Sequence, residues 1–159
     1  MNITPHFTYD EMRCKCGCGR VQVQTELCEK LEKLRDFLGG RPVVITSGFR
    51  CPSHSVAVGG YADDAHTRGI AADITVSGYT PAEICEAAEI VGFSGIGKMA
   101  NAVHVDIRNA KNYKNSHWYG DETTGKDVAT FITGRFNKSK SREVARFTIG
   151  GKTYVIMEE

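Results

Sequence analysis

Residues 70–76 and 102–107 alternate between apolar and other side chains with the two-residue period of a β-strand. In the first stretch, Asp73 faces away from the apolar residues Ile70, Ala72, Ile74 and Val76. In the second, His104 faces away from Val103, Val105 and Ile107. His66 precedes the first stretch, so two imidazoles and one carboxylate are available to a single centre. Three protein ligands that leave one position for water are typical of a catalytic zinc site. The pattern therefore predicts a sheet that buries one face and holds a metal ion on the other.

Helices are predicted on either side of the first strand in the sequence. Leucines recur at helical spacing over residues 26–38, with Thr25 as the expected N-cap. A second helix of about ten residues is predicted to begin at the capping box Thr80–Glu83, which has proline at the first helical position, and to end at Gly92. The predicted fold class is therefore α+β, with a small antiparallel sheet that carries helices on one face and the zinc site on the other.

Shorter elements are predicted around this core. Residues 43–46 are mostly β-branched and predict a short buried strand, and residues 95–107 predict a hairpin. Residues 1–24 are predicted to be irregular. A short helix is expected around residues 127–133, and two further strands are expected to meet at the Gly150-Gly151 pair.

Length and charge limit the kinds of protein that this chain can be. A chain of 159 residues is long enough for one domain with its own core. The predicted metal-binding domain covers residues 1–115, including a Cys-rich N-terminal segment, and residues 116–159 add a polar loop, the short helix and the hairpin packed on the same domain. A net charge of +1 argues against a nucleic-acid binder with a basic surface. The sequence contains no run of about 18 apolar residues, so membrane insertion is not predicted. A monomer is expected.

The six cysteines are unevenly distributed along the chain. Cys14, Cys16 and Cys18 are clustered at a spacing tighter than the usual C-x₂₋₄-C ligand pair. Three interpretations are open at this point: a second, structural zinc ion with His6 or Cys51 as the fourth ligand, a disulfide to Cys51, or free thiols.

Four motifs occur in the order in which one family of enzymes carries them. They are SGFRCPSH at 47–54, VGG at 58–60, HTRGIAADI at 66–74 and HVD at 104–106. With these motifs the chain resembles the zinc D-Ala-D-Ala carboxypeptidase family of peptidoglycan peptidases, within the larger group that includes lysostaphin and the hedgehog signalling domain. Residues 7–18 and the following leucine helix also resemble members found as phage lytic enzymes. The resemblance covers roughly residues 3–110.

The resemblance implies three zinc ligands: His66, Asp73 and His104. It also implies that Arg50, at a turn after a strand, binds a substrate carboxylate or stabilises developing oxyanion charge. His54 matches the family pattern as a substrate-binding residue, although an ordinary structural hydrogen bond explains it equally well. Asp64 is a further substrate-binding candidate, at a position where relatives often have serine.

At the positions where relatives carry the general base, this sequence differs from the family pattern. Relatives carry Glu or Asp three positions before the last zinc histidine, or a histidine two positions before it, and this chain has Asn101 and Ala102 there. Asp106 is the nearest carboxylate on the strand face of His104, and we predict it as the catalytic base. A hydrogen-bond partner of a ligand imidazole and a substitute ligand are the alternative roles for Asp106. Asp64 is the second candidate for the base.

These features predict a zinc metallopeptidase that hydrolyses a peptide bond in the stem peptide or cross-link of bacterial peptidoglycan by a metal-activated water. Related scaffolds include D-Ala-D-Ala carboxypeptidases, cross-link endopeptidases and L-Ala-D-Glu endopeptidases. The N-terminal residues lack the pattern of a signal peptide, so we expect synthesis in the cytoplasm and action on the wall after phage-type release, as an endolysin. The alternative, which Asn101 and Ala102 motivate, is a non-catalytic zinc-containing module that binds the cell wall or belongs to a phage particle.

Overall fold

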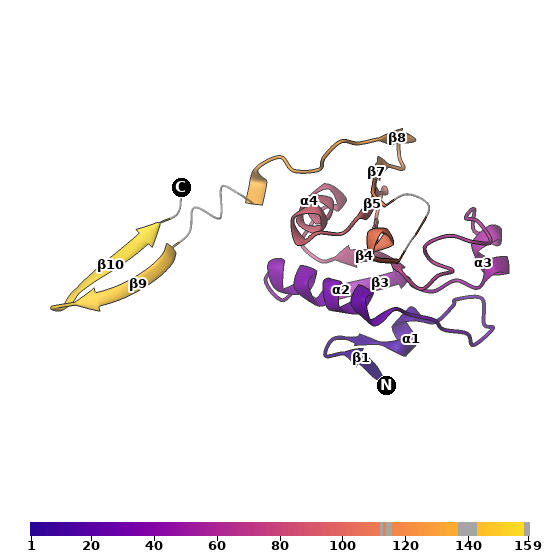
Figure 1. The fold of residues 1–159 in the computed structure, drawn as a ribbon, viewed down its shortest axis with the longest axis horizontal. Coiled ribbons are helices and arrows are strands. Elements are labelled where there is room, and N and C mark those ends of the chain that lie inside the picture. Colours follow the sequence, from indigo (N-terminus) through magenta and orange to yellow (C-terminus); the bar gives the residue numbers. More distant parts are fainter. Residues whose placement is uncertain (112, 114–115, 137–142, 158–159) are drawn as a thin grey trace.

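The computed structural model describes residues 1–111, 113, 116–136 and 143–157, and a six-stranded sheet lies at its centre (Figure 1). In order across the sheet the strands are β3 (Val43–Ser47), β4 (Ala71–Val76), β6 (Val103–Asp106), β5 (Gly95–Lys98), β7 (Trp118–Asp121) and β8 (Lys126–Asp127). The predicted hairpin is confirmed, since β5 and β6 pair antiparallel.

The sheet is mixed, so the predicted all-antiparallel sheet is wrong at one pair of strands. β5 and β7 run parallel, whereas the other neighbouring strands run antiparallel. β7 follows β6 in the chain but pairs with the free edge of β5. Because β6 is antiparallel to β5 and β7 returns in the opposite direction to β6, β7 is parallel to β5. The returning strand carries Trp118 back to the level of Gly95, at the start of β5.

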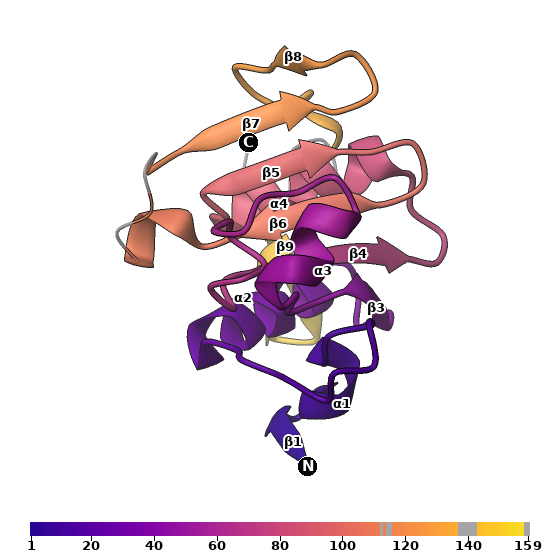
Figure 2. The ribbon, with the colours of Figure 1, turned by 90° about the vertical axis from the view of Figure 1, so that its right-hand side faces the viewer.

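Two helices pack on one face of this sheet: α2 (Thr25–Phe37) and α4 (Pro81–Val91). Figures 1 and 2 show them on the opposite side of the sheet from the short helix α3 (Pro52–Ala57). One continuous core joins the helices to the strands, and it includes Leu27, Leu31, Leu34, Ile84, Ile74, Val103 and Val105. Full burial of one such side chain stabilises the fold by about 1.5–3 kcal/mol. Among the described residues, no helix is long and apolar enough to cross a membrane.

The ends of both helices test the predicted capping residues. The capping box is confirmed, because the Thr80 side chain accepts from the Glu83 N–H and the Glu83 carboxylate accepts from the Thr80 N–H. Gly92 ends α4 in the left-handed region, at a φ of 104°. The predicted cap of α2 is wrong by one position: Gln24 is the N-cap and makes no side-chain capping bond, and Thr25 is the first helical residue.

The N-terminal segment is more regular than expected. Residues 1–24 contain β1 (Asn2–Thr4), β2 (Phe7–Thr8) and α1 (Tyr9–Met12). A second capping box, between Thr8 and Glu11, starts α1. Phe7 and Met12 are fully buried, which anchors these short elements on the main core. The expectation of an irregular segment is wrong for residues 1–12, because burial of two side chains stabilises elements too short to show a periodic pattern, and it is confirmed for residues 13–24, which contain no helix or strand.

Two further expectations are also corrected. The strand at residues 43–46 is not buried throughout, because β3 lies at the edge of the sheet and Val44 is 52% exposed. The helix expected at residues 127–133 is absent: Asp127 ends β8, and residues 128–133 form no helix. Carboxylates of α4 accept the N–H groups of Phe131 and Thr133, and this replaces the bonds that a helix would make.

The remaining described elements are a short helix after β6 and a hairpin near the C-terminus. A short 3₁₀ helix, η1, covers Arg108–Lys111. β9 (Glu143–Ile149) and β10 (Lys152–Met157) pair with each other in a sheet of their own, joined at Gly150 and Gly151 as predicted. That this hairpin packs on the peptidase domain stays a prediction.

The Glu86 side chain binds the segment that follows β8 through hydrogen bonds. Its side chain is 1% exposed, and its carboxylate accepts from the N–H groups of Thr133 and Arg135 and from the Thr133 hydroxyl. We expect Glu86→Gln to lower the free energy of unfolding by about 1–3 kcal/mol, because one acceptor oxygen becomes a donor. Urea unfolding of the variant, beside the exposed Glu29→Gln control, measures this.

The effect of Glu86→Gln has a defined dependence on pH. Burial raises the pKa of Glu86, but the hydrogen bonds from Thr133 and Arg135 outweigh it and hold the pKa below the ordinary value of 4.5. The stabilisation by the carboxylate is therefore fully present above pH 4.5 and is lost as the pH falls through the folded pKa. If the difference in free energy of unfolding between the wild type and Glu86→Gln grows as the pH falls, this account is contradicted.

Candidate metal centre

The three predicted ligands are placed by two strands and one turn. Asp73 of β4 and His104 of β6 are directly opposite in the antiparallel pairing, so their side chains share one face of the sheet. His66 lies in the turn before β4, where Asp64 and Thr67 bind each other through side chains and backbone N–H groups. Gly69 closes this turn at a φ of 69°, and a Cβ there would lie 2.4 Å from the Gln22 carbonyl oxygen.

The ligand atoms form a nearly equilateral triangle. His66 Nε2 lies 3.2 Å from His104 Nδ1, His104 Nδ1 lies 3.2 Å from Asp73 Oδ1, and His66 Nε2 lies 3.3 Å from Asp73 Oδ1. A tetrahedral zinc ion with bonds of about 2.0–2.1 Å keeps neighbouring ligand atoms about 3.3–3.4 Å apart. All three side chains are buried. The triangle therefore has the size of one face of a zinc coordination tetrahedron.

The hydrogen bonds behind the two imidazoles set their tautomers. His66 Nδ1 lies 2.8 Å from the Gly48 carbonyl oxygen, which only accepts, so the proton is on Nδ1 and the lone pair of Nε2 faces the centre. His104 Nε2 lies 2.8 Å from Asp106 Oδ2, so its proton is on Nε2 and the lone pair of Nδ1 faces inward. With neutral imidazoles, three acceptor atoms converge on one point, and only a cation satisfies all of them.

A proton competes with a metal ion for this point. Burial lowers the pKa of His104, but the Asp106 and Asp73 carboxylates outweigh it and raise the pKa to about 10. In the metal-free protein His104 is therefore protonated at neutral pH, and metal binding must release that proton.

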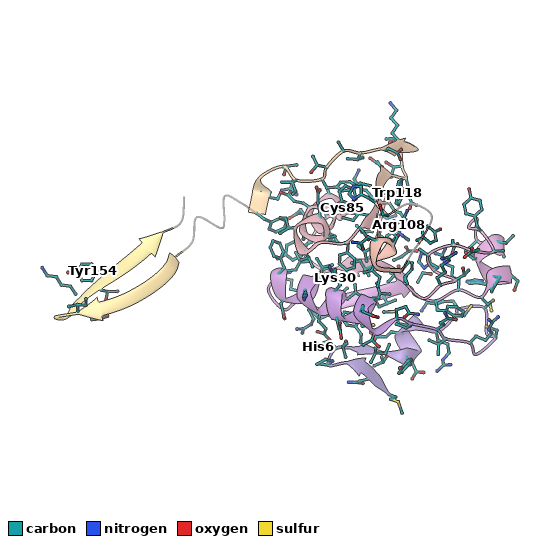
Figure 3. All side chains as sticks on the ribbon, viewed as in Figure 1. His6, Lys30, Cys85, Arg108, Trp118 and Tyr154 are labelled. Carbon is teal, nitrogen blue, oxygen red and sulfur yellow. The ribbon has the colours of Figure 1, made fainter. Side chains whose placement is uncertain are left out.

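The triangle lies in a cavity of about 350 Å³. The walls include the side chains of Arg50, Tyr61, Asp64, Arg108, Trp118 and Glu122. The Arg108 guanidinium lies 5.3 Å from the centre of the Trp118 ring, and these two residues appear side by side in Figure 3. The Trp118 ring also meets the His104 ring edge to face at 6.1 Å. The centre is thus reached through an opening with polar and aromatic walls.

The sequence model of the peptidase M15 family matches residues 5–107, which include all three residues of the triangle. The chain belongs to the peptidase M15 family. The predicted resemblance to zinc D-Ala-D-Ala carboxypeptidase-like enzymes is confirmed, and membership supports a metallopeptidase. No curated protein matches the chain. The matched residues exclude Trp118 and Glu122, so these two parts of the cavity wall are contributed by the chain beyond the family match.

In this M15 peptidase, Asp106 lies behind His104 and does not line the cavity. It is fully buried, and it accepts from His104 on one oxygen and from the Arg108 guanidinium on both, at distances of 2.7–3.1 Å. Burial raises the pKa of Asp106, but His104 and Arg108 lower it well below its usual range. Gly95 leaves the room for this carboxylate, since a Cβ there would lie 2.2 Å from its oxygens.

Arg50 lies at the edge of the centre and contacts one of the candidate ligands. Its guanidinium donates to Asp73 Oδ2 at 2.8 Å and to the Ser47 hydroxyl at 3.0 Å. Burial raises the pKa of Asp73, and the contacts with His104 and His66 lower it well below its usual range. Arg50 thus holds the second oxygen of Asp73, while the first oxygen faces the triangle.

The other two predicted substrate-binding residues lie in different surroundings. Asp64 lines the cavity, but its oxygens accept from the Ser55 hydroxyl and from the N–H groups of Tyr61 and Thr67. Burial raises the pKa of Asp64, and these hydrogen bonds bring it below its usual value. His54 is in α3 and is not among the described residues that line the cavity.

Glu122 is a cavity residue that sequence reasoning missed. It follows β7 directly, and its N–H donates to the Lys98 carbonyl at 2.8 Å. One carboxylate oxygen lies 2.6 Å from where a Cβ of Gly97 would be, and Gly97 is the cross-strand partner of His104. The alternation of glycines at 95 and 97 in β5 was the signal in the sequence, because it leaves space on this face of the sheet.

Four cysteines form a second group of possible ligands. The sulfur atoms of Cys14, Cys16, Cys18 and Cys51 all lie within 4.8 Å of one another, and none of the four is in a disulfide. His6, the alternative fourth member, is instead paired with Glu32 at 2.8 Å. A hydrogen bond from Ser53 lowers the pKa of the Cys51 thiol to about 6.

Asp106→Asn tests the hydrogen bonds that orient His104. The amide removes the charge that pairs with Arg108 and weakens the acceptor for His104 Nε2–H, so we expect the affinity for zinc to fall roughly 10–100-fold. Competition with a zinc-binding dye measures this affinity, and the exposed Asp36→Asn variant serves as the control. An unchanged affinity for zinc would show that Asp106 does not orient the imidazole.

Proposed function

We propose that this chain is a zinc-dependent peptidase that hydrolyses an amide bond in the stem peptide or cross-link of bacterial peptidoglycan. The observation that carries the proposal is the convergence of His66 Nε2, Asp73 Oδ1 and His104 Nδ1 in the cavity of an M15 family member. Action as a phage-type endolysin is part of the proposal.

Zinc is the ion that this donor set fits. Two imidazole nitrogens and one carboxylate oxygen suit a borderline-soft ion, and the separations of 3.2–3.3 Å match a tetrahedral ion. Bound there, zinc supplies Lewis acidity for attack of water on a peptide carbonyl. His66, Asp73 and His104 would hold it, and the cavity around these three residues gives a substrate access to them.

For the general base we propose Glu122 in place of Asp106. Both oxygens of Asp106 are engaged by His104 and Arg108, its pKa is held low, and it does not line the cavity. Asp64 is engaged by three donors. Among the residues that the structure describes, nothing donates a hydrogen bond to the Glu122 carboxylate, which is exposed and borders the cavity. Glu122 can therefore take a proton from the attacking water and deliver it to the leaving amine.

Arg50 and Trp118 are the proposed substrate contacts. Arg50 donates one N–H to Asp73 and one to Ser47, and its guanidinium lines the cavity, so further N–H groups are available to a substrate carbonyl or carboxylate. Stem peptides carry free carboxylates, which suit this guanidinium. Trp118 adds an aromatic wall for the peptide side chains. Asp64 acts through the loop that it orders at Tyr61, and His54 has no direct role in this proposal.

A non-catalytic zinc module that binds the wall or belongs to a phage particle is the second candidate. Asn101 and Ala102 favour it, because they occupy the positions where relatives of the predicted family carry the base. The two candidates differ in one measurable property, the release of muropeptides by zinc-loaded protein.

The test incubates purified, zinc-loaded protein with peptidoglycan and identifies the released muropeptides by mass spectrometry. We expect release by the wild type and none by His66→Ala or by chelated protein. Glu122→Gln is expected to keep its zinc and to lower kcat by roughly 10²–10⁴-fold, the usual contribution of a general base. The exposed Glu29→Gln variant is the matched control.

Each outcome separates the candidates. Release by Glu122→Gln at the wild-type rate rules out Glu122 as the base but leaves the peptidase proposal in place. A wild type that binds zinc and peptidoglycan but releases nothing supports the non-catalytic module and overturns the proposal.

A further inference from the structure

We propose that Cys14, Cys16, Cys18 and Cys51 hold a second, structural zinc ion that fixes the turn carrying Gly48 and Arg50 beside the metal centre. The four thiols come from two segments that are far apart in the sequence and meet at one corner of the fold. The inference is independent of the proposed function, because a structural ion of this kind suits a peptidase and a binding module equally.

The separations of the sulfur atoms fit a shared ion. Cys14 Sγ lies 3.4 Å from Cys16 Sγ, and Cys16 Sγ lies 3.7 Å from Cys51 Sγ. A tetrahedral zinc ion with Zn–S bonds of about 2.3 Å places sulfur atoms about 3.8 Å apart. A disulfide requires about 2.05 Å. Four sulfurs within 4.8 Å of one another therefore match a Cys₄ zinc site better than a pair of disulfides.

The backbone around the thiols is arranged to stabilise negative charge on sulfur. The Arg20 N–H donates to Cys18 Sγ at 3.5 Å, and the Cys51 N–H donates to Cys14 Sγ at 3.3 Å. Gly17 and Gly19 have φ values of 86° and 76°, in the left-handed region, which lets the chain turn tightly enough for three cysteines at alternate positions to face one point. Hydrogen bonds to a thiolate favour its charged form, the form that binds metal.

The loop that carries the three clustered cysteines buries little apolar surface. Residues 13–20 contain no helix or strand, and the contacts of this segment with the main core begin at Val21 and Val23. Cys14 and Cys51 form a small buried cluster with Phe49, separate from the main core. Cys16 and Cys18 are exposed. A segment with so little apolar burial is commonly stabilised by a metal or a disulfide, and the sulfur separations favour the metal.

The site connects directly to the catalytic face. Cys51 follows Arg50, whose guanidinium holds Asp73. The Phe49 N–H donates to the Met12 carbonyl at 2.8 Å, and the Gly48 carbonyl accepts from His66. A Cβ on Gly48 would lie 2.7 Å from Met12 Cα, so the N-terminal segment packs closely on this turn. An ion on the four cysteines therefore restrains the groups that orient His66 and Asp73.

The experiment counts zinc ions per chain by elemental analysis after purification under reducing conditions. We expect two zinc ions in the wild type, one in His66→Ala, one in the Cys16→Ser/Cys18→Ser variant and none when the three changes are combined. Cys16 and Cys18 are chosen because they are exposed, and Cys85→Ala, at a buried cysteine outside the cluster, is the control that keeps both ions.

Cobalt substitution tests the ligand type without any change to the cysteines. His66→Ala loaded with Co²⁺ is expected to show intense thiolate-to-cobalt charge-transfer absorption, and its absence would contradict cysteine ligation. This arm holds even if the serine variants fail to fold. A zinc count unchanged by Cys16→Ser/Cys18→Ser, or intact masses that show disulfides among the four cysteines in protein purified without reductant, overturns the inference. Either result leaves the peptidase proposal, which depends on His66, untouched.

Discussion

The mutual approach of three hydrogen-bond acceptors on the open face of the sheet is the constraint on which the rest of the structure depends. His66, Asp73 and His104 converge with ligand atoms 3.2–3.3 Å apart, an arrangement that is unfavourable for neutral imidazoles unless a cation occupies the point between them. Each of the three residues makes a hydrogen bond on the side away from the triangle. His66 bonds to the Gly48 carbonyl, Asp73 to Arg50 and His104 to Asp106. The partners of the triangle thus explain why a buried carboxylate and a tightly packed glycine turn lie where they do.

The sheet supplies the rigidity that this centre needs. Asp73 and His104 are cross-strand partners on β4 and β6, and their neighbours Ile74 and Val103 point into the core under the two helices. A shift of one residue in the register would exchange the two faces and turn Asp73 and His104 into the hydrophobic core, so the core fixes the position of these candidate ligand atoms. The alternation of side chains along β4 and β6 therefore accounts both for the stability of the core and for the geometry of the centre.

Much of this arrangement could be predicted from the sequence, because the decisive signals are local. The alternation at residues 70–76 indicates which face Asp73 occupies, and the capping box at Thr80–Glu83 marks the start of α4. The family motifs indicate His66 and His104, and the family match over residues 5–107 agrees with that resemblance.

The errors have tertiary causes. Glu122 reaches the cavity because β7 returns on the free edge of β5, a long-range pairing; the glycines at 95 and 97 indicate space on that face of the sheet but not which residue fills it. Asp106 as the base is not among these errors and stays a prediction: it shares a strand face with His104, but the same geometry brings it into contact with Arg108, and it does not line the cavity. The helix expected at residues 127–133 is replaced by hydrogen bonds to carboxylates of α4, which no inspection of that segment alone reveals.

The central claim is that one metal ion binds between His66, Asp73 and His104. Anomalous diffraction from crystals of the zinc-loaded protein, recorded on both sides of the zinc absorption edge, tests it most directly. The account predicts a peak bonded to His66 Nε2, Asp73 Oδ1 and His104 Nδ1, with Asp106 outside the coordination shell. A zinc-loaded crystal without a peak at this point, or a zinc ion bonded to Asp106 in place of Asp73, would contradict it.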